Sequence, residues 1–257
     1  MSPDSTFIPD WPGLPAHIGA ISTLRAGGVS LPPYDDGFGR GGFNLAGHVG
    51  DRTEDVERNR AMLNSVLPQK PLWLSQVHGT AVLDLGQPHT KLVADACFTD
   101  LPGVVCAVQT ADCLPVLFCD GKTNVVAAAH AGWRGLVHGV LENTLASMQT
   151  AGAEIKHIQA WLGPAIGPLA FEVGAEVREQ FIAADRRASA AFKASEDNPN
   201  KFYADIVELA RMRLRRAGIV NISGGEFCTV RQKAKFYSYR RDGVTGRMAS
   251  LIWIREK

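Results

Sequence analysis

Short apolar runs closed by Gly, Asp, Asn or Pro dominate the chain from residue 71 onward. Runs of this length with such ends are typical of β-strands in a buried sheet. We therefore predict a core sheet from the first part of this region and a hairpin near the end of the chain. The predicted strands span residues 71–78, 80–85, 103–109, 113–119, 124–130 and 158–164, with the hairpin at 236–241 and 248–254.

Other stretches repeat their apolar residues every three to four positions, which indicates amphipathic helices. The stretch 51–67 also has acidic residues in its first turn, where they stabilise the positive end of a helix. The remaining predicted helices span residues 134–149, 174–184 and 203–218. Strands mixed with helices in this way predict a layered α/β domain of the α+β type.

The opening segment is rich in Gly and Pro and contains a glycine pattern that mimics a nucleotide-binding motif. Gly37, Gly39 and Gly42 match G-x-G-x-x-G, the fingerprint of dinucleotide-binding folds. That motif requires a strand before it and a helix that opens at its last glycine, whereas PPYDD precedes it here. We therefore interpret the match to the dinucleotide motif as coincidental.

Length and charge favour one domain that acts on a small molecule. The 257 residues, 46% of them hydrophobic, are near the length at which a single core stops growing, and there are no repeats or linkers. We therefore predict a single catalytic domain over residues 1–257. With 27 Lys and Arg against 26 Asp and Glu, the chain has no net field that attracts nucleic acid or a membrane surface.

The start of the chain and its apolar runs predict a cytoplasmic protein. Acidic residues and prolines fill the first positions, where a secretory signal needs basic and then apolar residues. The longest apolar stretch, 103–120, is interrupted by Gln109, Asp112 and Pro115, so it does not resemble a membrane span.

The five cysteines are expected to be reduced thiols. Their number is odd, and a chain of this size does not depend on disulfides. Cys97, Cys106 and Cys119 lie in or beside apolar runs, so we expect them to be buried as small hydrophobic residues.

Three ligand-type residues stand at the ends of predicted strands: His78, Cys113 and His130. The gaps of 35 and 17 positions between them are far looser than those of a zinc finger, so the spacing alone is a weak metal signal. Each residue also has an ordinary interpretation: His78 as a surface histidine in a turn, Cys113 as a core thiol, and His130 as a buried histidine that binds the backbone. The Ala-Gly that follows His130 and the polar Asp112 beside Cys113 favour a site instead.

Three nitrogen and sulfur ligands with a fourth position open to water are typical of catalytic zinc. Such an ion acidifies a water molecule or polarises a substrate atom. The zinc nucleobase deaminases use H-x-E with P-C-x-x-C, and neither string occurs in this sequence. Any deaminase activity must therefore depend on a different architecture.

The chain also resembles a known family through six strings in a fixed order. The strings are FNLAGHVGD, SQVHGT, TADCLPVLF, AAAHAGWRGL, WLGPAIGPLAFEVG and FYSYRRDGVTGRMASLIW, and together they cover nearly the whole chain. They are similar to those of the laccase-domain family, once called polyphenol oxidases. The resemblance implies a central β-sandwich flanked by helices, and zinc bound by His78, Cys113 and His130.

The same resemblance implies an activity. Members of the family act as purine nucleoside phosphorylases, in which phosphate cleaves the N-glycosidic bond of adenosine, inosine or guanosine. Some members deaminate adenosine or act on methylthioadenosine, and a bacterial branch is tied to peptidoglycan editing. The expected partners are therefore a purine nucleoside and phosphate, with the protein a monomer or weak homodimer.

Further site residues are expected around the metal. Asn44 and Arg60 match strings that the resemblance places at the active site, although they also suit a turn and a solvated helix face. An anion needs cations, which Arg60, Arg134, Arg240 and Arg241 could supply, and His48 is another candidate. The expected catalytic residues are Arg60, Cys113 and Asp112, and the expected substrate-binding residues are Asn44, Gln76 and Arg240.

Alternative functions remain open on the sequence alone. One makes Cys113 a nucleophile and His130 its base in a hydrolase or editing factor that acts on a peptidoglycan precursor. Another is a partner-binding module without catalysis. The old family name is not supported, because laccases hold several coppers with many histidines, some in H-x-H pairs, and this chain has seven histidines and no H-x-H. A single copper could still substitute for zinc at the site.

Overall fold

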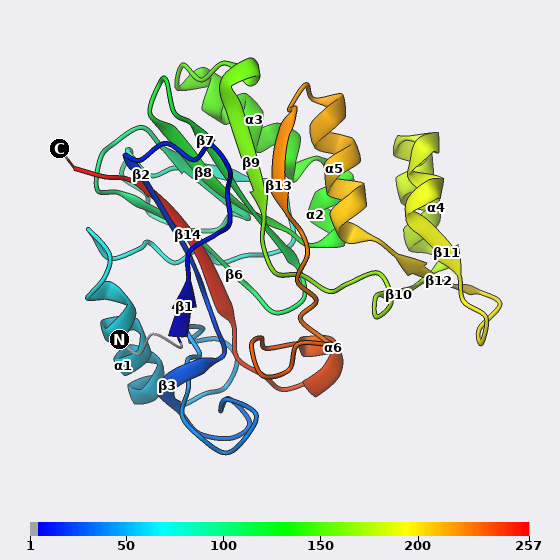
Figure 1. Cartoon of the computed structure of the whole chain (residues 1–257), viewed down its shortest axis with the longest axis horizontal. Coiled ribbons are helices and arrows are strands. Elements are labelled where there is room, and N and C mark those ends of the chain that lie inside the picture. Colours follow the sequence, from blue (N-terminus) through cyan, green and yellow to red (C-terminus); the bar gives the residue numbers. More distant parts are fainter. Residues whose placement is uncertain (1–4, 257) are drawn as a thin grey trace.

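Two β-sheets lie face to face at the centre of the computed structural model, which describes residues 5–256 (Figure 1). Apolar side chains from both sheets fill the space between them. In spatial order the smaller sheet contains β1 (Thr6–Phe7), β2 (Ile18–Thr23), β14 (Met248–Ile254) and β6 (Val105–Thr110). The larger contains β13 (Asn221–Gly224), β9 (Ile158–Leu162), β7 (Leu114–Asp120), β8 (Val125–Ala131), β5 (Ala96–Thr99) and β4 (Val82–Asp84).

The central strands β7 and β8 of the larger sheet are buried on both faces, toward which their successive side chains point in turn. In β7, Val116 and Phe118 belong to the core beneath the helices, whereas Leu117 and Cys119 belong to the core between the sheets. This is why the sequence shows unbroken apolar runs instead of alternation.

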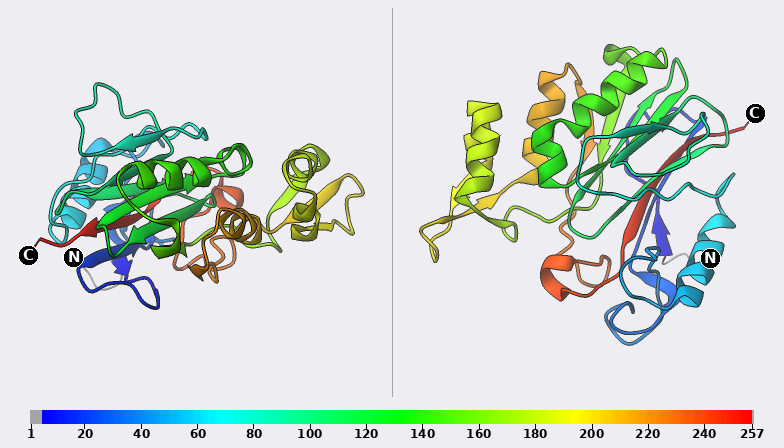
Figure 2. Two further views of the ribbon diagram at one scale, coloured as in Figure 1. Left: turned by 90° about the horizontal axis from the view of Figure 1, so that it is seen from above. Right: turned by 180° about the vertical axis from the view of Figure 1, so that it is seen from behind.

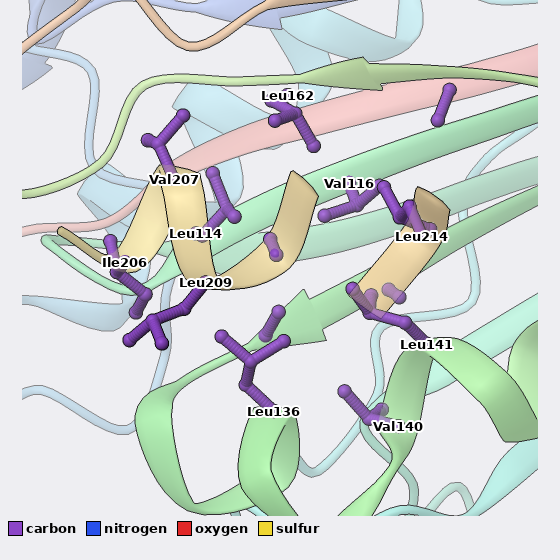
Figure 3. Packing of buried hydrophobic residues seen from close by; sticks show 14 of the residues in the cluster. Leu114, Val116, Leu136, Val140, Leu141, Leu162, Ile206, Val207, Leu209 and Leu214 are labelled. Atoms are coloured by element: carbon purple, nitrogen blue, oxygen red, sulfur yellow. The ribbon is translucent and has the colours of Figure 1, made fainter. Parts of the chain in front are cut away.

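Helices cover the outer faces of both sheets, which confirms the predicted sandwich flanked by helices. Leucine and valine side chains from three helices pack against one face of the larger sheet (Figure 3). The helices are α2 (Trp133–His138), α3 (Val140–Thr150) and α5 (Ile206–Arg216). On the smaller sheet, α1 (Thr53–Asn64) packs its Leu63 against Leu251 and Trp253 of β14.

A small third sheet extends beyond α5 at one end of the molecule (Figure 2). Its strands are antiparallel, and the adjoining helix packs its Val177 and Phe181 into the core beneath the helices. This part contains β10 (Glu172–Gly174), β12 (Lys201–Ala204), β11 (Phe192–Ala194), α4 (Ala175–Ala184) and the 3-10 helix η3 (Arg186–Ala191). The remaining elements are β3 (Ala26–Ser30), the 3-10 helix η2 (Ile155–His157) and α6 (Tyr239–Asp242).

Several predicted elements are wrong. Residues 71–78 form no strand, and only Ser75 makes a β-bridge, to Val93. Residues 236–241 form no hairpin arm: they lead into α6, which Ser238 caps by accepting a hydrogen bond from the Arg241 amide. The partners of β14 are instead β2 and β6, which are distant in sequence.

Two further parts of the chain differ from the predicted elements. The single helix predicted at 134–149 is divided into α2 and α3 at Gly139, whose φ of 100° only glycine adopts readily. Strands β1 to β3 lie in the opening segment, where no strand was predicted. No helix begins at Gly42, which makes β-bridges to Ala26 and Ser30, so the glycine pattern lacks the helix that a dinucleotide-binding motif requires.

The five cysteines are free, and Cys97, Cys106 and Cys119 are buried as predicted. Within residues 5–256, no helix is both long and apolar enough to span a bilayer.

Candidate functional site

Cys113 and His130 meet because two antiparallel strands place them at the same sheet edge. Pro115 near the start of β7 pairs with His130 near the end of β8, and Cys113 stands just before β7. On the other side of β8, Ala129 pairs with Ala96, which places Asp95 beside His130. Residues far apart in the sequence are thus neighbours through strand register alone.

The third ligand-type residue, His78, is positioned by a loop instead of a strand. The buried Asp95 carboxylate accepts hydrogen bonds from three consecutive amides, those of Val77, His78 and Gly79, at 3.1, 2.9 and 2.7 Å. Three adjacent amides that converge on one carboxylate cannot form a strand ladder, so no strand can continue through Val77 and His78 at the end of the predicted range 71–78. His78 itself has a φ of 59°, in the left-handed region.

Asp95 also fixes the other histidine. The Nδ1 atom of His130 lies 2.8 Å from Asp95 Oδ1, and the His130 amide donates to the Asp95 carbonyl at 2.6 Å. Since Nδ1 is engaged, Nε2 is the ring atom left to bind a ligand, the usual arrangement of metal-binding histidines. One buried carboxylate therefore orients the His130 ring and holds the backbone of the loop that carries His78.

The electrostatics of the cluster favour a thiolate at Cys113. Burial alone would raise its pKa, but the charge and hydrogen bonds of His130, followed by those of His78, lower the pKa of Cys113 to about 6. Burial likewise opposes protonation of His130, yet Cys113 and Asp95 raise the pKa of that histidine to about 9. The deprotonated thiol is the form that binds metals.

The donor set fits a single metal ion. One ligand atom from each of His78, Cys113 and His130 lies within 4.8 Å of the others, so the atoms can converge on one centre. Imidazole nitrogen with thiolate sulfur suits zinc and copper and is unsuited to magnesium or calcium. His78 is exposed, so the cluster is open to solvent on one side, as a catalytic site needs.

A cavity of about 480 Å³ opens directly on this cluster. Its volume is within the range of small-molecule sites. Its walls come from several segments: the loops at residues 48 and 76–78, the ends of β6 and β8, the loop into β7, the start of α2, α6, and the residue before β14. The lining residues are His48, Gln76, His78, Gln109, Thr110, Ala111, Cys113, His130, Trp133, Arg134, Tyr239 and Arg247.

The cavity has a basic wall. Arg247 is half-buried, and its Nη1 donates to the carbonyls of Thr245 and Gly246. Arg134 is exposed, with its guanidinium 4.5 Å from the centre of the Trp133 ring. Positive charge close to a partly dry cavity attracts an anion more strongly than charge in open water does.

The expected residues Asn44, Arg60 and Gln76 surround this cavity at different depths. Gln76 lines it and exchanges two hydrogen bonds of 2.8 Å with the Gln109 backbone. Asn44 lies fully buried behind the wall, where its Oδ1 accepts the Arg247 amide at 2.9 Å. Arg60 also stands behind the wall: its Nε donates to the Leu45 carbonyl at 2.9 Å.

The expected residues Asp112, Arg240 and Arg241 lie on the other side of Cys113. Asp112 has a φ of 93° and accepts hydrogen bonds from the Arg240 amide and the Thr229 hydroxyl. The Arg240 guanidinium donates to two carbonyls of the chain and lines a separate, apolar cavity. The Arg241 guanidinium donates hydrogen bonds to three backbone carbonyls and to Asp242, so it stabilises the local fold instead of facing the cavity.

Sequence reasoning missed Asp95, Arg247 and Tyr239. Asp95 was detectable as an acidic residue directly before the apolar run ACF, since a charge beside a buried strand needs partners. Arg247 and Tyr239 belong to a quoted string, but nothing in their local pattern indicates that β14 and α6 bring them to the metal cluster.

A β-sandwich that carries a His-Cys-His cluster beside its strand ends is an α/β protein with a candidate metal site. A family model described as multi-copper polyphenol oxidoreductase laccase matches residues 19–255. The chain therefore belongs to this laccase-like family.

Its relatives extend over nearly the full chain. Purine nucleoside phosphorylase YfiH of Shigella flexneri is 54% identical over 251 residues, covering 96% of this chain and 98% of that protein. The purine nucleoside phosphorylase of Pseudomonas aeruginosa is 51% identical over 250 residues, with 97% and 98% covered.

Solved structures share the fold. Neisseria meningitidis protein NMB0706 has a TM-score of 0.88 at 45% identity, over 98% of this chain and all (100%) of that one. YlmD from Geobacillus stearothermophilus has a TM-score of 0.83 at 30% identity, over 99% and 100% of the two chains.

Because Asp95 binds the His130 ring and the His78 backbone, Asp95→Asn is expected to weaken binding of added zinc at this cluster by about 10- to 100-fold, measured by competition with a chelator. The amide cannot accept all the hydrogen bonds that the carboxylate accepts. Asp120→Asn is the matched control: Asp120 is equally buried and accepts three backbone amides far from the cluster, at Lys122, Thr123 and Glu154. Equal loss of zinc affinity in both variants would reduce Asp95 to a general stabilising role.

Proposed function

We propose that this chain is a zinc-dependent purine nucleoside phosphorylase that converts adenosine, inosine or guanosine and phosphate into free base and ribose 1-phosphate. The observation that carries the proposal is the His78, Cys113 and His130 cluster at the floor of a cavity with arginines in its wall. The names of the relatives, which are 43 to 54% identical for the first six, support the reaction class.

The reaction replaces one bond at the ribose C1′ by another. A phosphate oxygen forms the new bond to C1′ while the C1′–N9 bond breaks, and the base leaves with the electron pair and takes up the proton that phosphate gives up. Zinc, when bound, supplies a Lewis acid beside the reacting atoms. His78, Cys113 and His130 would hold it.

Four further residues around the cavity are proposed to bind phosphate or to position the groups that bind it. Arg247 and Arg134 are placed to bind the phosphate oxygens, since guanidinium groups match phosphate geometry. Arg60 adds positive charge behind the wall and holds the Leu45 carbonyl, which also accepts a hydrogen bond from Gln109 Nε2 at 2.8 Å. Asn44 acts through Arg247, whose amide it binds.

We extend the proposal to deamination of adenosine and phosphorolysis of methylthioadenosine as side activities of the same centre. In deamination, water adds to the carbon that bears the amino group and ammonia leaves. Zinc, if held by His78, Cys113 and His130, would supply the Lewis acidity that this reaction needs. The five free thiols agree with action in a reducing compartment, and we propose the cytoplasm and a single catalytic domain.

A second candidate has one specific observation in its favour. The Cys113 and His130 pair, with its lowered thiol pKa and raised imidazole pKa, is also what a cysteine nucleophile requires. In that case the protein would be a hydrolase, including one that edits a peptidoglycan precursor. Metal-free protein would then be active, and alkylation of Cys113 would abolish its activity.

Product formation from inosine is expected to depend fully on inorganic phosphate. Incubation with and without phosphate, followed by chromatography of hypoxanthine and ribose 1-phosphate, measures this dependence. The proposal predicts both products in equal amounts with phosphate and neither without it. Hypoxanthine and free ribose at the same rate in the absence of phosphate would instead define a hydrolase.

A further inference from the structure

An apolar cavity of about 130 Å³ adjoins the metal-site cavity. The two cavities share four wall residues, Ala111, Cys113, Trp133 and Tyr239. Cys113 therefore stands at their junction, with polar space on one side and apolar space on the other.

The walls of the smaller cavity differ from those of its neighbour. Ile166, Phe171 and Ile206 close it from the core beneath the helices. Its one arginine, Arg240, is turned to the backbone carbonyls of Ala170 and Glu172, with its guanidinium 5.7 Å from the centre of the Phe171 ring. The cavity thus offers aromatic faces and apolar walls, which favour a flat, weakly charged ring over a phosphate.

Tyr239 lies between the two cavities, and a hydrogen bond of the next residue, Arg240, anchors its backbone. The Arg240 amide donates to Asp112 Oδ2 at 2.6 Å, which fastens α6 to the loop that carries Cys113. The Tyr239 side chain itself remains 63% exposed. An exposed aromatic ring on an anchored turn, beside a cavity, is suited to stack on a ligand.

We propose that the apolar cavity binds the purine base, stacked on Tyr239, while the basic wall of the larger cavity binds phosphate. This assignment rests on the proposed function. The ribose then spans the junction, and the bond between C1′ and N9 lies beside the His78, Cys113 and His130 cluster. Asp112 acts as a positioning residue, because it anchors the turn that carries Tyr239.

Tyr239→Leu tests the assignment, because the exposed side chain can be replaced without disturbing the core. Because a base stacks on the aromatic face, the variant should raise KM for inosine about tenfold. It should change KM for phosphate much less, because Arg247 and Arg134 supply the charge that binds phosphate. Tyr239→Phe keeps the aromatic face and should recover at least part of the loss. The matched control is Tyr203→Leu, since Tyr203 lines an acidic cavity of about 490 Å³ elsewhere.

Binding of free hypoxanthine, measured by equilibrium dialysis, separates this inference from the proposed function. A tenfold weaker hypoxanthine affinity in Tyr239→Leu supports the subsite even if phosphorolysis is absent. Phosphate-dependent cleavage with unchanged KM and hypoxanthine affinity in Tyr239→Leu would overturn the subsite and leave the function standing. An equal loss in Tyr203→Leu would overturn it as well.

Discussion

Cys113→Ser, His78→Ala and His130→Ala are each expected to lose bound zinc and to lower kcat/KM for phosphorolysis by more than about 10²-fold. Loss of residues that only orient ligands already costs about 10- to 100-fold, so loss of a ligand should cost more. Elemental analysis gives the metal content, and phosphorolysis of inosine gives the activity. Metal and activity should fall together because the same atoms support both.

The chain provides matched controls for these ligand variants. Cys228 is half-buried like Cys113 and lies outside the cluster, with its sulfur 3.3 Å from the Gly167 amide. His138 is an exposed histidine at the end of α2. Cys228→Ser and His138→Ala should keep full zinc and full activity. Full zinc occupancy in all three ligand variants would remove the basis for the assignment.

Arg247→Gln is expected to lower kcat/KM on the order of 10²-fold, mainly through a higher KM for phosphate. The substitution removes the charge that lines the cavity but keeps a hydrogen-bond donor for the carbonyls of Thr245 and Gly246. Steady-state kinetics with phosphate varied at saturating inosine measure the effect, and thermal unfolding checks the fold.

Arg60 is the comparison for Arg247, because its guanidinium lies against Trp73 behind the cavity wall. Burial lowers the pKa of Arg60, and Glu57 partly offsets the shift. Arg60→Ala should lower kcat/KM less than Arg247→Gln does, with partial recovery in Arg60→Lys. A larger effect at Arg60, with wild-type kinetics at Arg247, would reassign the phosphate site.

The sequence predicted the strands whose burial is decided by their own pattern. Residues 113–119, 124–130 and 248–254 form β7, β8 and β14 within a residue or two at each end. The strand predictions failed where contacts with residues distant in sequence, or a local helix cap, determine the backbone. The Asp95 carboxylate fixes the backbone at the end of residues 71–78. In residues 236–241, the Ser238 cap starts a helix, and the side chains of Phe236 and Tyr237 are buried.

The same distinction holds for the site. His78, Cys113 and His130 were found because each residue type binds metals and stands beside an apolar run, and the structure brings them together. Asp95 and Arg247 were missed because strand register and the Asn44 side chain determine their partners. The acidic residue before the apolar run 96–98 indicated only that Asp95 needs partners. Arg241 looked suited to an anion, but its donors are used by backbone carbonyls.

Titration of metal-free protein with zinc tests the metal-centred reaction most directly. Zinc would be removed with a chelator and returned stepwise while phosphate-dependent cleavage of inosine is followed. The account predicts that the rate rises in proportion to added zinc and reaches its maximum at about one equivalent per chain. Full phosphorolysis by the metal-free protein, unchanged by added zinc, would contradict it.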